Sequence, residues 1–351
     1  MQSQTDADLR PYHTFGLSQP CAHLVHVHSI DDIRAVYRDS AWQSLPKLML
    51  GKGSNMLFTE PFQGVVMING LQGKRLTESA DHWHVHVEAG EDWHSLVEWT
   101  VEHGYAGLEN LALIPGCAGS APIQNIGAYG VELKEVCEYV DVLCLESMSV
   151  KRLSNAECQF GYRDSVFKRA LYQKAIVVAI GLKLRKAWRA NIHYGPLKAL
   201  GEQATPAEIF QQVCAIRREK LPDPSQIGNA GSFFKNPVIT QDHYQELQAR
   251  YPDMVAYPAE EGMKIAAGWL IDQCGLKGKT MGGAQVHPHQ ALVLVNTGTA
   301  TAQDVVQLAD LVCQTVKKHY GIELEHEVRF MAAKRETCLK EIIKAYKSME
   351  K

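Results

Sequence analysis

A glycine-rich stretch at 114–130, IPGCAGSAPIQNIGAYG, is the part of the sequence best suited to holding a ligand with backbone atoms. Its glycines and prolines let the chain turn tightly and adopt positive φ, and its N–H groups can then lie against a diphosphate. Its polar side chains include Ser120, Gln124 and Asn125. An irregular surface connection can have the same composition, so this alternative stays open.

Single polar residues elsewhere could carry the chemistry itself. Arg163 lies in a glycine-flanked turn, where a guanidinium is either a surface charge or a clamp for an anion. Ser232 follows a glycine in NAGSFFKNP and is either an ordinary turn residue or a catalytic hydroxyl. Glu327 and Arg329 alternate with apolar residues, so in a strand both charges share one face. Residue type alone leaves each of these alternatives open.

A second glycine turn, GKGSN at 51–55, lies between two short apolar runs of strand length. It lacks the spacing of a P-loop, and no G-x-G-x-x-G stands between a strand and a helix. Neither nucleotide hydrolysis nor a Rossmann domain is therefore supported. Two separate glycine turns favour instead a cofactor that lies between two lobes.

Three histidines, His82, His84 and His86, alternate with apolar residues and so share one face of a strand. A metal site could have this pattern, but an exposed strand face explains it equally well, and we predict no metal site. The nine cysteines are scattered without a C-x-x-C pair, which predicts reduced thiols in a cytosolic compartment.

Length and charge narrow the class of protein. The 351 residues suffice for two or three domains, and the net charge of −3 comes without a long Lys/Arg block. The N-terminal residues are polar and acidic, and no apolar run reaches the ~18 residues of a membrane span. We therefore expect a cytoplasmic protein that binds a small molecule and neither nucleic acid nor membrane.

The elements that position these residues follow from hydrophobic periodicity and from caps and breaks. Strands are expected at 22–28, 47–50, 65–68, 136–145, 175–184, 291–295 and 324–330. Helices are expected at 29–38, 93–103, 205–220, 241–251, 264–274 and 301–320. A proline-containing break at 221–224 predicts a domain boundary, and 336–351 is expected to form an appended charged helix.

Seven segments together resemble the UDP-N-acetylenolpyruvoylglucosamine reductase (UDP-N-acetylmuramate dehydrogenase) family, flavoenzymes of bacterial peptidoglycan synthesis and thus of cell wall biogenesis, cell shape and cell division. In the family's order they are GKGSN at 51, IPGCAGSAPIQNIGAYG at 114, FGYRDSVFK at 160, KLPDP at 220, GNAGSFFKNP at 228, AAGWLIDQCGLKG at 266 and EHEVRF at 325. Tyr194, in HYGPL, resembles the type I subgroup, in which a tyrosine from this region folds over the substrate. Two departures are mild: Lys52 stands where a glycine is frequent, and His13 where Asn commonly precedes Thr.

The resemblance implies an α+β fold with a two-lobed FAD-binding domain of the vanillyl-alcohol-oxidase type and a separate α+β substrate-binding domain. We expect lobe 1 over 1–70, lobe 2 over 71–220 joined by a returning strand at 321–335, and the substrate-binding domain over 221–320. The resemblance also implies non-covalent FAD, with NADPH as the hydride donor. The alternatives are a flavin oxidase of the same fold that tethers FAD through Cys117, and a UDP-sugar-binding protein without the chemistry.

The resemblance implies three catalytic residues, Arg163, Ser232 and Glu327. Hydride would pass from N5 of FAD to C3 of the enolpyruvyl group, and Ser232 would give a proton to C2. Glu327 is unusual beside an anionic substrate, so we expect it to be protonated or compensated by Arg163, Lys220 or Arg329. The matching substrate-site residues are Tyr129, Tyr194, Lys220, Asn236, Gln290 and Arg329. The expected cofactor-binding residues are Gly51, Lys52, Gly53, Ser54, Asn55, Gly116, Gly119, Ser120, Gln124, Asn125, Gly127 and Ala128. We expect a monomer.

Overall fold

The computed structural model describes residues 3–349, which divide into two compact units. Unit 1 comprises the residues up to Thr5, His23–Lys52 and Gly64–Glu219. Unit 2 comprises Asp6–Ala22, Gly53–Gln63 and the residues from Lys220 onward. The finer division into lobes and domains that the sequence suggests stays a prediction.

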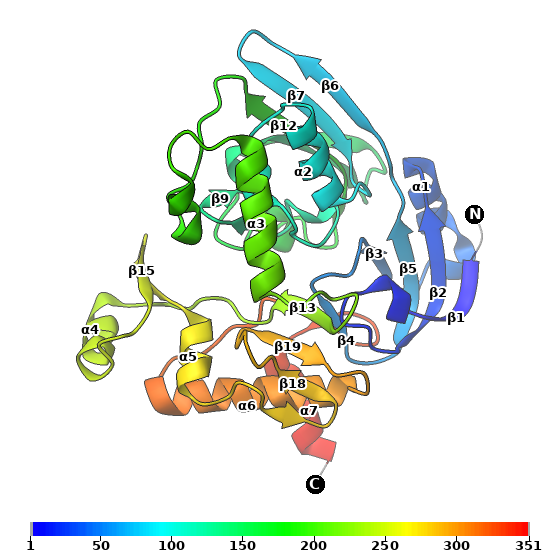
Figure 1. Ribbon diagram of the computed structural model, residues 1–351. Helices are drawn as coiled ribbons and strands as arrows, with labels where there is room; N and C mark the ends of the chain where they lie inside the picture. The colour runs from blue at the N-terminus through cyan, green and yellow to red at the C-terminus, as the bar shows by residue number, and fades with distance from the viewer. Residues whose placement is uncertain (1–2, 350–351) are drawn as a thin grey trace. The chain divides into compact units, whose positions relative to one another are not determined.

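Unit 1 contains a five-stranded antiparallel sheet with the order β11-β10-β12-β7-β6 (Figure 1). Its strands are β6 (Lys74–Glu78), β7 (His82–Glu88), β10 (Cys137–Cys144), β11 (Val150–Ser154) and β12 (Ala175–Arg185). Apolar residues of this sheet pack with those of α2 (Trp93–Glu102) and α3 (Pro206–Lys220) in one buried core. The β-branched runs expected to form β10 and β12, and the two helices, are confirmed.

A second sheet has the order β1-β2-β5-β3. Its strands are β1 (Ser3–Asp8), β2 (Pro20–Val27), β3 (Lys47–Leu50) and β5 (Phe62–Asn69), and β3 runs parallel to β5. The helix α1 (Ile30–Arg38) begins with the expected capping box, in which the Asp32 N–H donates to Ser29 Oγ at 3.1 Å. Because β3 is an edge strand and ends at Leu50, the glycine turn at 51–55 starts at the edge of this sheet.

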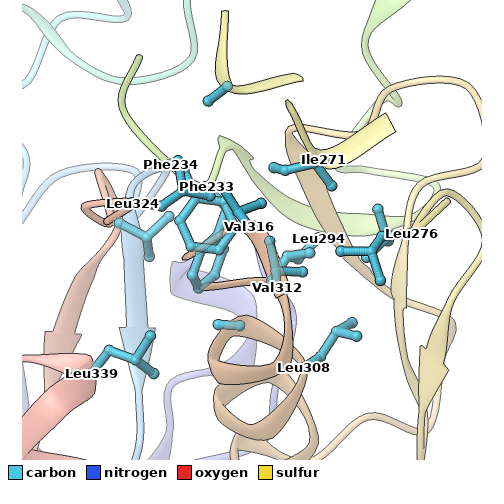
Figure 2. Close-up of a cluster of buried hydrophobic side chains, with 14 of the residues drawn as sticks. Phe233, Phe234, Ile271, Leu276, Leu294, Leu308, Val312, Val316, Leu324 and Leu339 are labelled. Atoms are coloured by element: carbon cyan, nitrogen blue, oxygen red, sulfur yellow. The ribbon is translucent and has the colours of Figure 1, made fainter. Parts of the chain in front are cut away.

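Unit 2 is built on α6 (Ala302–Tyr320), which contacts a four-stranded sheet of order β13-β19-β18-β17 (Figure 1). The strands are β13 (Gly228–Ser232), β17 (Thr280–Met281), β18 (Ala284–Val286) and β19 (Val293–Asn296). Figure 2 shows Phe233 and Phe234 beside Val316 of α6 and Leu324 in the buried core. The two phenylalanines directly follow β13, so they anchor the end of that strand.

Two three-stranded sheets complete unit 2. One has the order β14-β16-β15 and consists of β14 (Val238–Ile239), β15 (Ala256–Ala259) and β16 (Gly262–Ile265). In the chain, β14 precedes α4 (Gln241–Arg250), and β15 and β16 lie between α4 and α5 (Ala267–Gln273). The helix expected from residue 264 therefore begins three residues later, because Lys264 pairs with Val238 and Tyr257 in this sheet. The other has the order β21-β20-β4, with β4 (Met56–Phe58), β20 (Arg329–Met331) and β21 (Glu336–Thr337).

The C-terminal segment differs from the expected appended helix. Residues Glu336–Thr337 form β21, and the helix α7 (Leu339–Met349) begins only after it; residues 350–351 lie outside the described residues. Leu339 and Ile342 are buried in the core of unit 2. The segment is thus part of that core. Within residues 3–349, no helix has both the length and the apolar character needed to cross a membrane.

Candidate active site

Backbone hydrogen bonds hold the glycine-rich stretch 114–130 in unit 1. The N–H groups of Ala118 and Gly119 donate to the carbonyls of Glu91 and Ala89, each at 2.8 Å. The Ser120 hydroxyl accepts the N–H of Cys117 at 3.1 Å and donates to its carbonyl at 2.7 Å. These groups are used within the protein, so the stretch keeps fewer N–H groups for a diphosphate than its composition suggests. The cofactor contacts of Gly119 and Ser120 stay predictions.

The start of the glycine turn at 51–55 packs closely on this stretch. A Cβ atom on Gly51 would lie 2.5 Å from Sγ of Cys117, so a larger residue would clash with the Cys117 side chain. A Cβ atom on Gly119 would likewise lie 2.5 Å from that of Ala89. Lys52 forms an ion pair with Asp92 at 2.5 Å. Gly51 and Gly119 thus allow close packing against Cys117 and Ala89, and this glycine-containing region suits a phosphate-bearing cofactor such as FAD.

In unit 2, Gly53 packs against the N-terminal arm at Tyr12–Gly16. Gly53 has φ +56°, and its carbonyl accepts the Thr14 N–H at 3.2 Å. Nδ1 of His13 and Oγ1 of Thr14 are buried and have no hydrogen-bond partner within residues 3–349. Because buried polar atoms normally have partners, both atoms fit a polar ligand group. Neither residue was predicted for the site; the departure at His13 was the one signal in the sequence.

Arg163 lies in a tight turn that is fastened to the glycine-rich stretch. Gly161 and Asp164 exchange backbone hydrogen bonds of 2.9 and 3.3 Å, with Arg163 at φ +53° between them. Nη2 of Arg163 donates to the carbonyl of Gly127 at 3.1 Å. The fully buried Asn125 donates from its amide to the carbonyl of Gly161 at 3.0 Å. These hydrogen bonds join the turn to the glycine-rich stretch, and they limit where the Arg163 guanidinium can lie.

Near the C-terminal end of the stretch, the ring of Tyr129 contacts the ring of Tyr194. The Tyr129 ring lies 6.0 Å from the ring of Tyr194 in an edge-to-face arrangement. The side-chain amide of Asn110 donates to the carbonyls of Tyr129 at 3.0 Å and Asn191 at 2.8 Å. Tyr194 is 46% exposed. The two predicted substrate-site tyrosines thus belong to one surface of unit 1.

Arg217, on α3, was not predicted from the sequence. Its Nε donates to the carbonyl of Leu113 at 3.2 Å. Burial lowers the pKa of Arg217, a hydrogen bond with Tyr129 opposes that shift, and the nearby charge of Arg163 adds to it. Arg217 lies four residues after the buried Val213, on the apolar face of the helix. The signal in the sequence was a charged residue at a position where the helical pattern predicts a buried one.

In unit 2, the segments that carry Ser232 and Glu327 are neighbours. The N–H of Glu327 donates to the carbonyl of Phe233 at 2.8 Å, and the N–H of Lys235 donates to the carbonyl of Glu325 at 2.9 Å. Ser232 ends β13, opposite Val293 of β19. The expected proton donor thus ends a strand, and the expected carboxylate lies on the adjoining segment that leads into β20. Of the strand expected at 324–330, only the end is formed, in Arg329–Met331.

The end of the glycine turn at 51–55 also contacts the Glu327 segment. The amide of Asn55 donates to the carbonyl of Glu327 at 3.1 Å, and the carbonyl of Asn55 accepts the N–H of Arg329 at 3.0 Å. The Arg329 guanidinium donates to both carboxylate oxygens of Glu336, at 3.0 and 2.6 Å. Arg329, expected as one counter-ion for Glu327, thus forms a two-bond ion pair with Glu336.

Three further predicted substrate-site residues lie in unit 2. Oδ1 of Asn236 accepts the N–H of Ala267, the first residue of α5, at 3.0 Å. The backbone N–H of Gln290 donates to Nδ1 of His287 at 3.1 Å. Lys220 is exposed at the end of α3.

Two of the histidines of β7, His84 and His86, have protein partners. Nδ1 of His84 lies 2.8 Å from a carboxylate oxygen of Glu138, and Nδ1 of His86 lies 2.8 Å from the hydroxyl of Tyr139. Among residues 3–349, no group of three or more His, Cys, Asp or Glu side chains could hold a metal ion.

Two family models match the chain. An FAD binding domain matches residues 21–152, and the C-terminal domain of UDP-N-acetylenolpyruvoylglucosamine reductase matches residues 223–331. The UDP-N-acetylenolpyruvoylglucosamine reductase of Vibrio vulnificus (strain YJ016) is 60% identical over 343 residues, which cover 97% of this chain and 99% of that protein. The chain belongs to the UDP-N-acetylenolpyruvoylglucosamine reductase family.

Further members of the reductase family are similar to this chain over nearly its whole length. The protein of the same description from Vibrio cholerae serotype O1 (strain ATCC 39541 / Classical Ogawa 395 / O395) is 62% identical over 341 residues, covering 97% of this chain and 98% of that protein. The crystal structure of UDP-N-acetylenolpyruvylglucosamine reductase from Thermus caldophilus is 25% identical, with a TM-score of 0.66 over 94% of this chain and 98% of that chain. Membership in the reductase family confirms the expected fold class, the FAD-binding domain and the oxidoreductase class. The roles of single residues stay predictions.

Proposed function

We propose that the protein catalyses the NADPH-dependent reduction of UDP-N-acetylenolpyruvoylglucosamine to UDP-N-acetylmuramate, a step of peptidoglycan precursor synthesis. One observation within unit 2 carries the residue assignment: the N–H of Glu327 bonds to the carbonyl of Phe233, next to Ser232. A hydroxyl and a carboxylate on adjoining, hydrogen-bonded segments suit a step in which a carbon atom gains a proton.

The cofactor is FAD, for which the glycine turn at 51–55 and the stretch at 116–128 supply the proposed contacts. When bound, FAD supplies the hydride that C3 of the substrate receives, and NADPH restores it. The glycines at 51 and 119 serve this role indirectly, since they leave room for Cys117 and Ala89, respectively.

Arg163 is the proposed clamp for the substrate carboxylate. After C3 gains a hydride, negative charge develops at C2 and spreads into the carboxylate as an enolate. A guanidinium is always charged and presents a planar fork that a carboxylate accepts in two bonds. Because one Nη2 hydrogen bond fixes the side chain on Gly127, Arg163 is oriented before the substrate arrives.

Ser232 is the proposed proton donor to C2. A hydroxyl is a weak acid, so the step needs a strongly basic enolate and a neighbour that returns the proton to Ser232. Glu327 or Lys220 would fill that second role. Tyr129, Tyr194, Asn236, Gln290 and Arg329 would bind the remainder of the UDP-sugar. We further propose a cytoplasmic monomer that binds neither nucleic acid nor membrane.

Steady-state NADPH oxidation tests this function. We expect oxidation that depends on the enolpyruvyl sugar under anaerobic conditions, with a product heavier by two hydrogen atoms in mass spectrometry. Oxidation that proceeds equally without the sugar, or that needs oxygen, would point to a flavin oxidase instead. Light scattering during gel filtration checks the monomer.

A further inference from the structure

The C-terminal segment supplies a carboxylate to one of the proposed substrate-site residues. Both oxygens of Glu336 accept hydrogen bonds from Arg329, one from Nε at 3.0 Å and one from Nη2 at 2.6 Å. The two side chains are only 25% and 24% exposed. A bidentate, partly buried pair of this kind holds the guanidinium plane far more firmly than an exposed ion pair does.

The strand register explains why these two residues meet. Met331 of β20 lies opposite Glu336 of β21, and residues two apart on a strand share a face. Glu336 is therefore the diagonal neighbour of Arg329 on one face of the β20–β21 pair. The N–H of Arg329 is fixed as well, by the carbonyl of Asn55. Both the backbone and the side chain of Arg329 are thus oriented.

The rest of the segment keeps β21 in place. After β21, α7 begins at Leu339, and its residues Leu339 and Ile342 lie in the core of unit 2 with α6. Glu336 is therefore anchored by its own strand pairing with Met331 and by the helix packing that follows.

We propose that Glu336 is a positioning residue of the reductase, which sets the orientation of the Arg329 guanidinium for the substrate. The proposal rests on the function proposed above. With Nε and one Nη2 hydrogen directed to Glu336, the remaining donors of Arg329 point in one fixed direction. The pair is also close to neutral, so Arg329 acts as an oriented hydrogen-bond donor more than as an unscreened cation.

The test compares Glu336→Gln with Glu341→Gln in the full-length, FAD-loaded enzyme. Glu341 is a matched control, since it lies in the same segment and bonds to Arg335 at 3.0 Å and to Thr337 at 2.9 Å. In Glu336→Gln we expect kcat/KM for the enolpyruvyl sugar to fall about tenfold, mainly through KM, because a charged donor is no longer held in position. The rate of flavin reduction by NADPH should stay unchanged, and Glu336→Asp should recover part of the loss.

Several results would overturn the proposal. One is equal kinetics for Glu336→Gln and Glu341→Gln; another is an equal loss in both half-reactions. A double-mutant cycle with Arg329→Lys gives an independent readout, and additive effects on kcat/KM would contradict the coupling. If neither Glu336 variant folds while Glu341→Gln does, Glu336 has a purely structural role. A wild-type enzyme without sugar-dependent turnover would refute the proposed function itself, before any variant is compared.

Discussion

Replacing Asn125 by alanine should both destabilise unit 1 and displace Arg163. The Asn125 side chain is fully buried and makes three hydrogen bonds. Its amide donates to Glu132 at 3.1 Å and to the carbonyl of Gly161 at 3.0 Å, and its carbonyl accepts the N–H of Lys134 at 3.0 Å. Alanine would leave all three partners without this side chain.

The free energy of unfolding should fall by about 4 kcal/mol. Each hydrogen bond contributes on the order of 1 kcal/mol net, so the three amount to about 3 kcal/mol. Asn125 also has φ +44°, a conformation that asparagine tolerates and that costs alanine about 1 kcal/mol more. At about 2–4 °C per kcal/mol for a domain of this size, Tm should fall by about 8–16 °C.

Urea unfolding followed by tryptophan fluorescence measures the stability, and NADPH oxidation at a temperature where the variant is folded measures the activity. The matched control is Asn155→Ala, because the Asn155 amide also donates to two carbonyls, those of Lys134 at 2.8 Å and Cys137 at 2.7 Å. The control should cost about 2 kcal/mol and leave kcat/KM unchanged. In Asn125→Ala we expect kcat/KM for the sugar to fall at least about tenfold, because Arg163 is no longer held in place. Equal stability and equal activity in the two variants would refute the reasoning.

Three further predictions concern the proton donor, the arm and the cofactor. Ser232→Ala should slow sugar reduction by at least about 10²-fold in stopped-flow while flavin reduction by NADPH stays fast; equal slowing of both steps would exclude the proton-donor role. Burial lowers the pKa of His13 from 6.5, so the neutral ring stabilises the fold above pH 6.5, and this stability is lost as the pH falls through the lowered value. The unfolding free energy of wild type minus that of His13→Asn should therefore decrease below pH 6.5, and a difference that stays constant from pH 7.5 to 5 would argue against this role of burial. Acid precipitation should release the flavin into the supernatant; colour retained on the protein would favour a tether through Cys117.

Elements with local signals were predictable from the sequence. Ser29 and Asp32 form the capping box of α1, and Thr301 caps α6 through Asp304. The β-branched run of β12 and the apolar run of β3 also formed strands near the expected bounds. Helix caps and hydrophobic periodicity depend on residues only a few positions apart, so each segment's own sequence is enough to predict its helix or strand.

Features that depend on distant partners were not predictable. The sequence pattern predicts a helix from Lys264 onward, but pairing with Val238 and Tyr257 makes Lys264 part of a strand. The ligand contact expected of Asn125 stays a prediction, but its hydrogen bonds with Gly161 and Lys134 depend on partners that only the fold brings close. Arg217 and Glu336 were missed for the same reason, because what each contacts, Tyr129 or Arg329, follows only from the fold.

Anaerobic titration of the FAD-loaded protein tests the central claim most directly. Addition of NADPH should bleach the flavin absorbance, and subsequent addition of the enolpyruvyl sugar should restore it with formation of one UDP-N-acetylmuramate per flavin. Flavin that bleaches with NADPH but recovers only on admission of oxygen would contradict the assignment.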